Sequence, residues 1–240
     1  IDTFGAPAEA NAADWLVASE FLRYGGQLAV VRAATGVLNA TKDGSAVLVG
    51  SKEDYEAGAG SSEKFIARTA GTAGNNLRVV IVDRGADFTI TKSSHGLSVG
   101  GTYTDDAGVG HEVVEVVSAT QFRIIQGTAA PTPASGDQSA AFTNSDWNAT
   151  AIASTGLTYK AIGPRPGTSG YDSERHLSHD EVHVAVIDES TNSVVERLTY
   201  LSKLSDAKSA EGASVYWKDY VNEYSGYIYA SALTSAEVTT

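Results

Sequence analysis

Three histidines in the second half of the chain have a spacing that a metal site could use. His176, His179 and His183 follow one another at i, i+3 and i+7, and Asp180 and Glu181 lie among them. Two histidines three or four residues apart on a helix can bind one zinc ion, and a carboxylate can complete the site. These residue types raise the hypothesis of a metal centre.

The local pattern around these residues argues against that hypothesis. From residue 182 to residue 187 the sequence reads Val-His-Val-Ala-Val-Ile, which predicts a strand with His183 on the face opposite the valines. His176 and His179 precede this strand in an expected loop, so the helical geometry is missing. We predict ordinary loop and strand-surface histidines and no metal ligand.

Pairs of carboxylates and a glycine-rich segment are the other candidates for chemistry. The pairs are Asp105 and Asp106, Asp180 and Glu181, and Asp188 and Glu189. Acid–base catalysis needs two carboxyl groups that face one reacting centre, whereas adjacent residues of a strand point to opposite faces. We expect these pairs to be solvated strand ends.

The glycine-rich segment 70–76 lacks the Lys-Ser/Thr ending of a phosphate-binding loop and precedes a strand instead of a helix. It predicts a turn in which glycines adopt positive φ. A Ser-His-Asp triad would have to be chosen arbitrarily from many serines. We therefore predict no catalytic, cofactor-binding or metal-binding residues, no cofactor and no enzymatic activity.

The first part of the chain has a mixed pattern of helices and strands. Trp15, Ala18 and Leu22, with Phe21 beside them, form an apolar stripe that predicts a helix over residues 12–24 with Asn11 as its N-cap. Further elements are expected after it: strands at 27–33, 46–49 and 76–83, of which the last is the clearest buried strand of this half, and a helical turn at 51–56. Strands interleaved with helices predict an α/β layer arrangement.

The character changes over residues 86–148, where Gly, Thr and Ser abound and no helical period is visible. Residues 88–91 alternate apolar and polar, and 112–117 and 121–125 predict a hairpin. Residues 127–141 have the composition of a low-complexity return segment. We predict a small all-β, barrel-like domain here, inserted into the first one.

The mixed pattern resumes after residue 148. A helix is expected over residues 214–224, with Ser214 as its cap and Val215, Val221 and Tyr224 on or near its buried face. Aromatic residues gather there, and either packing in the core or an interface explains them: Tyr216, Trp217, Tyr220, Tyr224, Tyr227 and Tyr229. The predicted fold class is α+β, with a discontinuous mixed α/β core over 1–85 and 149–240 and an inserted β domain over 86–148.

Composition excludes several classes of function. The chain has 240 residues, a net charge of −12, no cysteine and no methionine. The absence of a basic stripe makes nucleic acid an unexpected direct partner, because binding to phosphates requires clustered Lys and Arg. Absent cysteines exclude disulfides and thiolate chemistry. No apolar run approaches the roughly 20 residues of a membrane-spanning helix.

Several motifs, in order and spacing, resemble the tail sheath proteins of contractile-tailed bacteriophages (myoviruses). The resemblance is strongest over residues 159–229 and rests on Pro-Arg-Pro-Gly-Thr-Ser at 164–169, the strand segment 180–189, and motifs at 200–208, 212–218 and 225–228. It is weaker over residues 12–84, where the helix, Tyr-Gly-Gly at 24–26 and the 75–83 segment recur. The inserted β region carries no firm resemblance.

The resemblance implies a structural role. Sheath subunits form six-membered rings that stack helically around a tail tube, and a baseplate signal makes the sheath contract and drive the tube through the host envelope. Its partners would be other copies of the sheath protein, the tail tube and the baseplate, in a virion tail assembled in the host cytoplasm. Because the chain lacks an initiating Met and the family's terminal arms and carboxy-terminal domain, we expect an internal fragment that is monomeric alone.

Two other roles remain open. A phage-derived injection machine, such as a bacteriocin or a secretion system, uses a similar sheath. Alternatively, the inserted β domain binds host-surface glycans, although its aromatic residues are few.

Overall fold

The computed structural model of this chain describes residue 9 and residues 12–25, 27–28, 36–42, 44–83, 85–176 and 179–231. The chain separates into two compact units, residues 1–37 and residues 38–240. In the first unit, α1 (Ala12–Arg23) confirms the predicted helix. Its expected N-cap Asn11 and most of the expected strand 27–33 lie outside the described residues. None of the side chains of α1 is buried, and Phe21 and Leu22 are 49% and 51% exposed.

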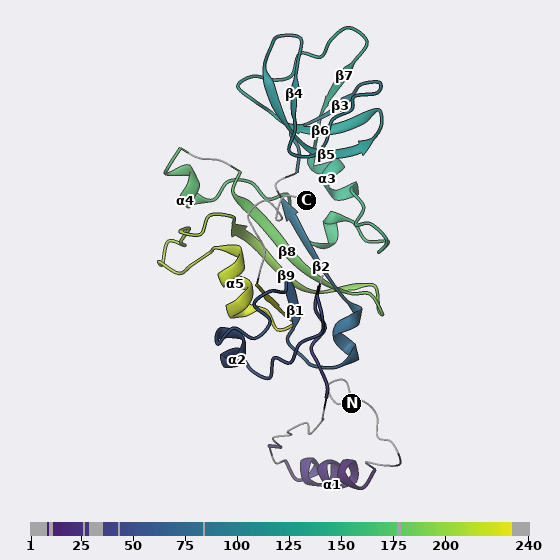
Figure 1. The fold of residues 1–240 in the computed structure, drawn as a ribbon, viewed down its shortest axis with the longest axis vertical. Helices are drawn as coiled ribbons and strands as arrows, with labels where there is room; N and C mark the ends of the chain where they lie inside the picture. Colours follow the sequence, from purple (N-terminus) through teal and green to yellow (C-terminus); the bar gives the residue numbers. More distant parts are fainter. Residues whose placement is uncertain are drawn as a thin grey trace. The chain divides into compact units, whose positions relative to one another are not determined.

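The second unit is built on a three-stranded antiparallel sheet in the order β2-β8-β9 (Figure 1). Its strands are β2 (Leu77–Asp83), β8 (Glu181–Asp188) and β9 (Ser193–Ser202). Both pairings are antiparallel, so the predicted α/β layer arrangement is wrong here, while the α+β class is confirmed. Antiparallel neighbours need no crossover helix between them, and one of the two connections is a short turn.

The central strand β8 is buried on both faces, which explains its continuous apolar sequence. Val182, Val184 and Val186 pack with Trp217 and Val221 of α5 (Trp217–Tyr224). On the other face Ala185 and Ile187 belong to a second cluster, which includes Trp147 of α3 (Asn144–Ala149). β2 lies at the edge and is mostly half-buried, so β8 and not β2 is the most deeply buried strand.

A small two-stranded sheet joins residues far apart in sequence. β1 (Phe65–Ala67) pairs antiparallel with β10 (Ile228–Ala230), and α2 (Lys52–Glu56) lies beside them, capped by Ser51. The predicted helical turn at 51–56 is therefore confirmed. The strand expected at 46–49 is wrong: among the described residues, this segment makes only an isolated bridge, between Val47 and Asn39.

Five antiparallel strands form a separate sheet in the order β4-β5-β6-β3-β7. They are β3 (Phe88–Thr91), β4 (Thr102–Thr104), β5 (Gly110–Ser118), β6 (Gln121–Ile125) and β7 (Gln138–Ala141). The predicted hairpin is confirmed as β5–β6, whereas the expected return segment contains β7. The sheet has β4 and β7 at its edges, and its status as an inserted, barrel-like domain over 86–148 stays a prediction.

The helix α5 begins three residues later than expected. Tyr216 occupies the N-cap position without a side-chain cap, so the predicted cap Ser214 is wrong. Ser214 instead bridges to Lys208 in an extended segment, which fixes its backbone outside the helix. Val221 is buried as expected, but Tyr224 is 59% exposed. Short helices at Thr72–Asn76, Tyr159–Ala161 and α4 (Gly170–Ser173) complete the described elements.

Candidate functional site

His183 is a structural residue of the core and not a surface histidine. Its ring lies opposite the valines of β8 as predicted, but that face is also buried, so the predicted exposure is wrong. Its Nδ1 accepts a hydrogen bond from the Tyr200 amide at 3.0 Å, which places the proton on Nε2. Nε2 donates this proton to the carbonyl of Pro164 at 2.6 Å. Both ring nitrogens therefore serve the fold.

A bulge in β9 makes this arrangement possible. The register between β8 and β9 shifts opposite His183, and Tyr200 has a positive φ of 58°. The extra residue turns the Tyr200 amide toward the imidazole, and the tyrosine ring packs edge-on against it at 4.8 Å. The Pro-Arg-Pro motif is thus tied to the central sheet through His183.

The other two histidines do not join His183. His176 and His179 lie in the connection between α4 and β8, both with positive φ, and His176 is exposed. Within the part of the chain that the structure describes, no three His, Cys, Asp or Glu side chains are placed to hold one metal ion.

Two of the six paired carboxylates are buried, which corrects the prediction of solvated strand ends. Asp180 is buried and accepts hydrogen bonds from the Ser169 amide at 2.8 Å and the Ser202 hydroxyl at 2.5 Å. Asp105 is buried as well, whereas its neighbour Asp106 is exposed. Burial of a carboxylate is costly unless hydrogen bonds replace the lost hydration, and both Asp180 and Asp105 accept such hydrogen bonds.

Asp105 organises the loops beside the five-stranded sheet. Its oxygens accept from the amides of Val109 at 2.8 Å and Thr132 at 2.7 Å, and Nε2 of the buried His111 lies 3.4 Å from Oδ2. Nδ1 of His111 accepts from the Gly127 amide at 3.0 Å, so Nε2 carries the proton. The Thr132 amide first, and then the Val109 amide and His111, lower the pKa of Asp105.

This geometry predicts a loss of stability in acid. Because the folded-state pKa of Asp105 is lowered, its stabilising contribution is present above the unfolded value of about 3.9 and is lost as the pH falls through the folded value. Asp105→Asn should unfold at a lower temperature than wild type at pH 6, and the gap should narrow toward pH 3. Thermal unfolding, monitored by circular dichroism, measures the difference in unfolding temperature at pH 6 and its decrease toward pH 3. Asp106→Asn is the matched control, and a gap of the same size for both variants would contradict the role of Asp105.

The glycine-rich segment forms the expected turn. Gly71 has a φ of 114°, which confirms the positive φ, and residues Thr72–Asn76 form a short 3-10 helix. Gly74 has another reason to be glycine: a Cβ there would lie 2.7 Å from the Cβ of Ala67 and 2.9 Å from that of Ala40. The segment therefore packs closely under β1.

The sequence also contains a Gly-x-Ser-x-Gly pattern that our sequence reasoning missed, at residues 96–100. A nucleophile elbow requires this pattern between a strand and a helix. Here Ser98 is exposed in a turn that leads to β4. Both ring nitrogens of the nearby His95 form hydrogen bonds with the backbone, at Ser118 and Leu97. His95 is therefore not available as a base for Ser98.

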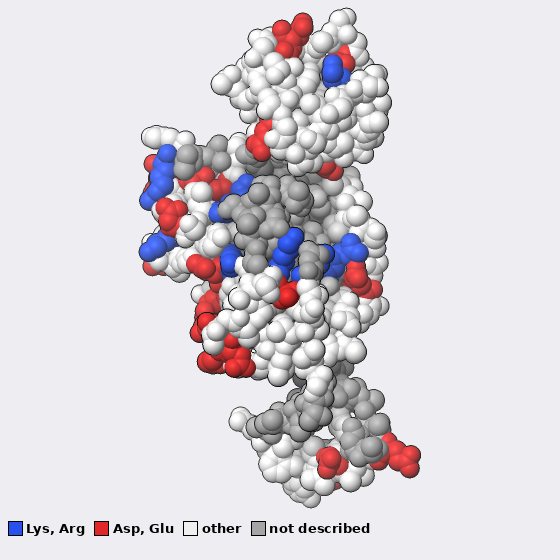
Figure 2. All heavy atoms as spheres, in the orientation of Figure 1, with Lys and Arg blue, Asp and Glu red and all other residues white. Residues whose placement is uncertain are grey.

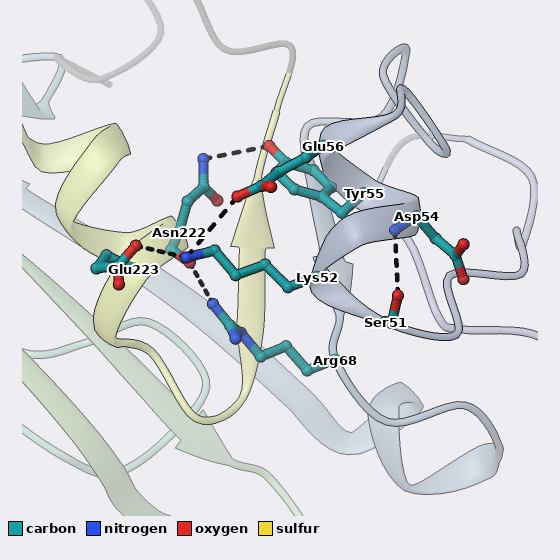
Figure 3. A network of polar contacts seen from close by, with 8 residues as sticks. All are labelled: Ser51, Lys52, Asp54, Tyr55, Glu56, Arg68, Asn222 and Glu223. Carbon is teal, nitrogen blue, oxygen red and sulfur yellow. Dashed lines mark hydrogen bonds and ion pairs between the residues drawn. The ribbon is translucent and has the colours of Figure 1, made fainter.

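The most extensive polar network lies between α2, α5, β1 and β10 (Figure 3). Arg68 donates to the carbonyls of Ile228 at 3.1 Å and Asn222 at 2.5 Å, and its guanidinium lies 4.1 Å from the centre of the Tyr229 ring. On its other face, the Tyr229 ring stacks on Tyr55 with centroids 4.4 Å apart. An arginine and a tyrosine thus enclose the Tyr229 ring.

Asn222 and Tyr55 complete this network. The Asn222 side chain exchanges hydrogen bonds with the backbone of Ala230 at 2.7 and 2.9 Å, and the Tyr55 hydroxyl donates to the same carbonyl at 2.7 Å. At the surface, Lys52 pairs with Glu223 at 2.5 Å, and this contact raises the pKa of Lys52 and lowers that of Glu223. The network joins residues more than 150 positions apart.

The aromatic residues near the end of the chain divide between core and surface. Trp217 and Tyr229 are buried and Tyr216 and Tyr220 are half-buried, whereas Tyr224 and Tyr227 are exposed. Core packing therefore explains part of the group, and two tyrosines stay on the surface.

Charge on the surface is mixed. On the face drawn in Figure 2, Lys and Arg side chains lie among Asp and Glu side chains and form no continuous basic stripe. Among the described helices, none has the length and apolar character needed to cross a membrane.

Comparison with known proteins confirms the resemblance expected from the sequence. The chain is 25% identical to the tail sheath protein of Salmonella phage ViI over 274 aligned positions, which cover 98% of this chain. It spans 42% of the length of that relative. No family model matches the chain. No solved structure matches it.

Proposed function

We propose that this chain is part of a subunit of a contractile phage tail sheath, which surrounds the tail tube and contracts to drive it through the host envelope during genome delivery. The observation that carries the proposal is the similarity to a tail sheath protein along 98% of the chain. Since the alignment extends along almost the whole chain, the similarity is not confined to one motif.

The side chains that the sequence marked as candidates for chemistry support a structural, non-enzymatic role. His183, His111, Asp180 and Asp105 all accept or donate hydrogen bonds within the fold. The mechanism we propose needs no cofactor and no hydrolysis, because the work comes from two alternative packings of one subunit. Rigid subunits suit this mechanism, and the network around Arg68 supplies rigidity where distant segments meet.

The proposed partners are other copies of the sheath protein, in stacked six-membered rings, together with the tail tube and the baseplate. The proposed location is the virion tail, after assembly in the host cytoplasm. A role in a phage-derived injection machine would use the same structure. Glycan binding by the five-stranded sheet is less favoured, because Phe88, Tyr103, Phe122, Phe142 and Trp147 are all buried or half-buried.

Assembly tests the proposal. We expect the complete gene product to form tubes visible by negative-stain electron microscopy, and the 240-residue chain alone to scatter light as a monomer. Tubes from the 240-residue chain would contradict the expected monomer. A complete gene product that stays a small soluble particle and turns over a small molecule would contradict the sheath role.

A further inference from the structure

Asp172 is a buried acid in which one of the two carboxyl oxygens lacks a hydrogen-bond partner among the described residues. Asp172 lies in α4 and is 2% exposed, and its Oδ1 has no hydrogen-bond partner among the described residues. Its backbone amide is held by the Ser169 hydroxyl at 3.1 Å, which fixes the residue in the first turn of the helix. A buried acceptor without a partner costs free energy, and the cost is greater for an ionised oxygen.

A second buried carboxylate, Asp180, adds to this cost. Both oxygens of Asp180 are already occupied, by the Ser169 amide and the Ser202 hydroxyl. Ser169 therefore ties the two acids to the same turn. Burial first, and then the charge of Asp180, raise the pKa of Asp172.

The other charged groups that shift the pKa of Asp172 are Arg175, Lys203 and Asp206, and the titratable side chains of His176 and His179 line the same cavity. Arg175 stacks on the Tyr171 ring at 3.4 Å and donates to the Tyr171 carbonyl at 2.8 Å. Lys203 pairs with Asp83 at 2.8 Å. Asp206 is exposed, accepts a hydrogen bond from Tyr171 and adds a further negative charge. Each nearby cation thus has another partner, and Asp172 gains no direct ion pair from them in the described structure.

We propose that Asp172 is a proton-operated latch for α4: while the acid is protonated, α4 stays docked on the segments that carry Asp180 and Asp206, and ionisation loosens it. Protonation removes a charge from a buried site and the repulsion from Asp180. Ionisation restores both the buried charge and the repulsion from Asp180. Only the Ser169 cap and local contacts then hold the short helix in place. The device does not depend on the sheath role.

The direction of the pH effect follows from the raised pKa of Asp172. The stabilising contribution of the proton is fully present below the unfolded value of about 3.9 and is lost as the pH rises through the folded value. This is opposite to the effect of Asp105. α4 should therefore be held more tightly in mild acid than at neutral pH.

The test uses the 240-residue chain and two isosteric variants. Asp172→Asn should raise the midpoint of thermal unfolding by a few degrees at pH 8, and the gain should shrink steadily toward pH 4.5. Hydrogen exchange of the amides of α4 should slow in this variant at pH 8. Asp206→Asn removes an exposed, solvent-screened charge from the same cluster, so its gain in unfolding midpoint at pH 8 should be much smaller than that of Asp172→Asn.

A midpoint that falls in Asp172→Asn at every pH, or a gain independent of pH, would overturn the latch. If the variant fails to fold, the wild-type chain decides the question by NMR titration of the Asp172 carboxyl carbon. A titration above the ordinary aspartate range supports the latch when the protection factors of the α4 amides, which correct for the intrinsic rise of exchange with pH, also fall above that pH. A titration in the ordinary range overturns it.

Discussion

Replacement of Trp147 by alanine should lower the free energy of unfolding by about 3–5 kcal/mol, the cost typical of removing a buried tryptophan. The indole is 1% exposed and packs with residues from three separate stretches, including Ala86, Ile162 and Ala185. Its Nε1 donates to the Gly163 carbonyl at 3.0 Å. The cavity would therefore open between the central sheet and the segment that returns from the five-stranded sheet.

Equilibrium unfolding in urea, followed by far-ultraviolet circular dichroism, measures this change. Trp147→Phe keeps much of the ring but leaves the Gly163 carbonyl unpaired, and should cost about 1–3 kcal/mol. Trp15→Ala is the control, because no side chain of α1 is buried and surface changes usually stay within about 0.5 kcal/mol. Equal costs for Trp147→Ala and Trp15→Ala would contradict the packing role of the Trp147 indole.

Strands and hairpins whose apolar pattern is local could be predicted from the sequence. β8, β2 and the β5–β6 hairpin lie where alternation or continuous apolar character placed them. The direction of strand pairing could not be predicted in this way, because an apolar run fits a parallel and an antiparallel neighbour equally well. The antiparallel order β2-β8-β9 depends on contacts between segments about 100 residues apart.

The burial of polar side chains was the feature that the sequence patterns predicted least well. Alternation correctly placed His183 opposite the valines of β8, but it cannot reveal that the second face of the sheet is also covered. The burial of Asp180 could not be predicted either, because its hydrogen-bond partners Ser169 and Ser202 come from two other segments. Adjacent charged residues resemble a solvated strand end until their hydrogen-bond partners are known.

The network around Arg68 could not be predicted at all. Tyr55, Arg68 and Asn222 have no distinctive spacing, and they meet only because β1 pairs with β10. The aromatic residues near the end of the chain gave a partial signal, since Tyr229 is one of them. The sequence patterns therefore predicted elements better than the contacts that join them.

Replacement of Arg68 by alanine should destabilise the second unit by about 2–4 kcal/mol. It removes two hydrogen bonds to a charged group, which contribute about 1.5–3 kcal/mol each, and partial solvent exposure of Arg68 reduces their sum. The guanidinium binds two carbonyls in the α5–β10 segment and covers one face of the Tyr229 ring. Its loss would leave the carbonyls of Asn222 and Ile228 without these donors. We expect β10 to separate from β1 before the central sheet unfolds. Hydrogen exchange of the amides of residues 68 and 231 would detect this separation, because they donate to the carbonyls of Tyr227 and Lys64 across the β1–β10 pair.

Two matched variants separate the geometry of Arg68 from its charge. Arg68→Lys keeps the charge but cannot form the planar fork or the same stacking, so it should recover less than half of the lost stability. Lys52→Ala removes a cation from the exposed Lys52–Glu223 pair of the same network and should leave the urea midpoint nearly unchanged. If Arg68→Lys restored all of the stability that Arg68→Ala loses, the charge of Arg68 alone would account for its role. An unchanged midpoint in Arg68→Ala would mean that the pairing of β1 with β10 and the Tyr55–Tyr229 stack hold these segments together without it.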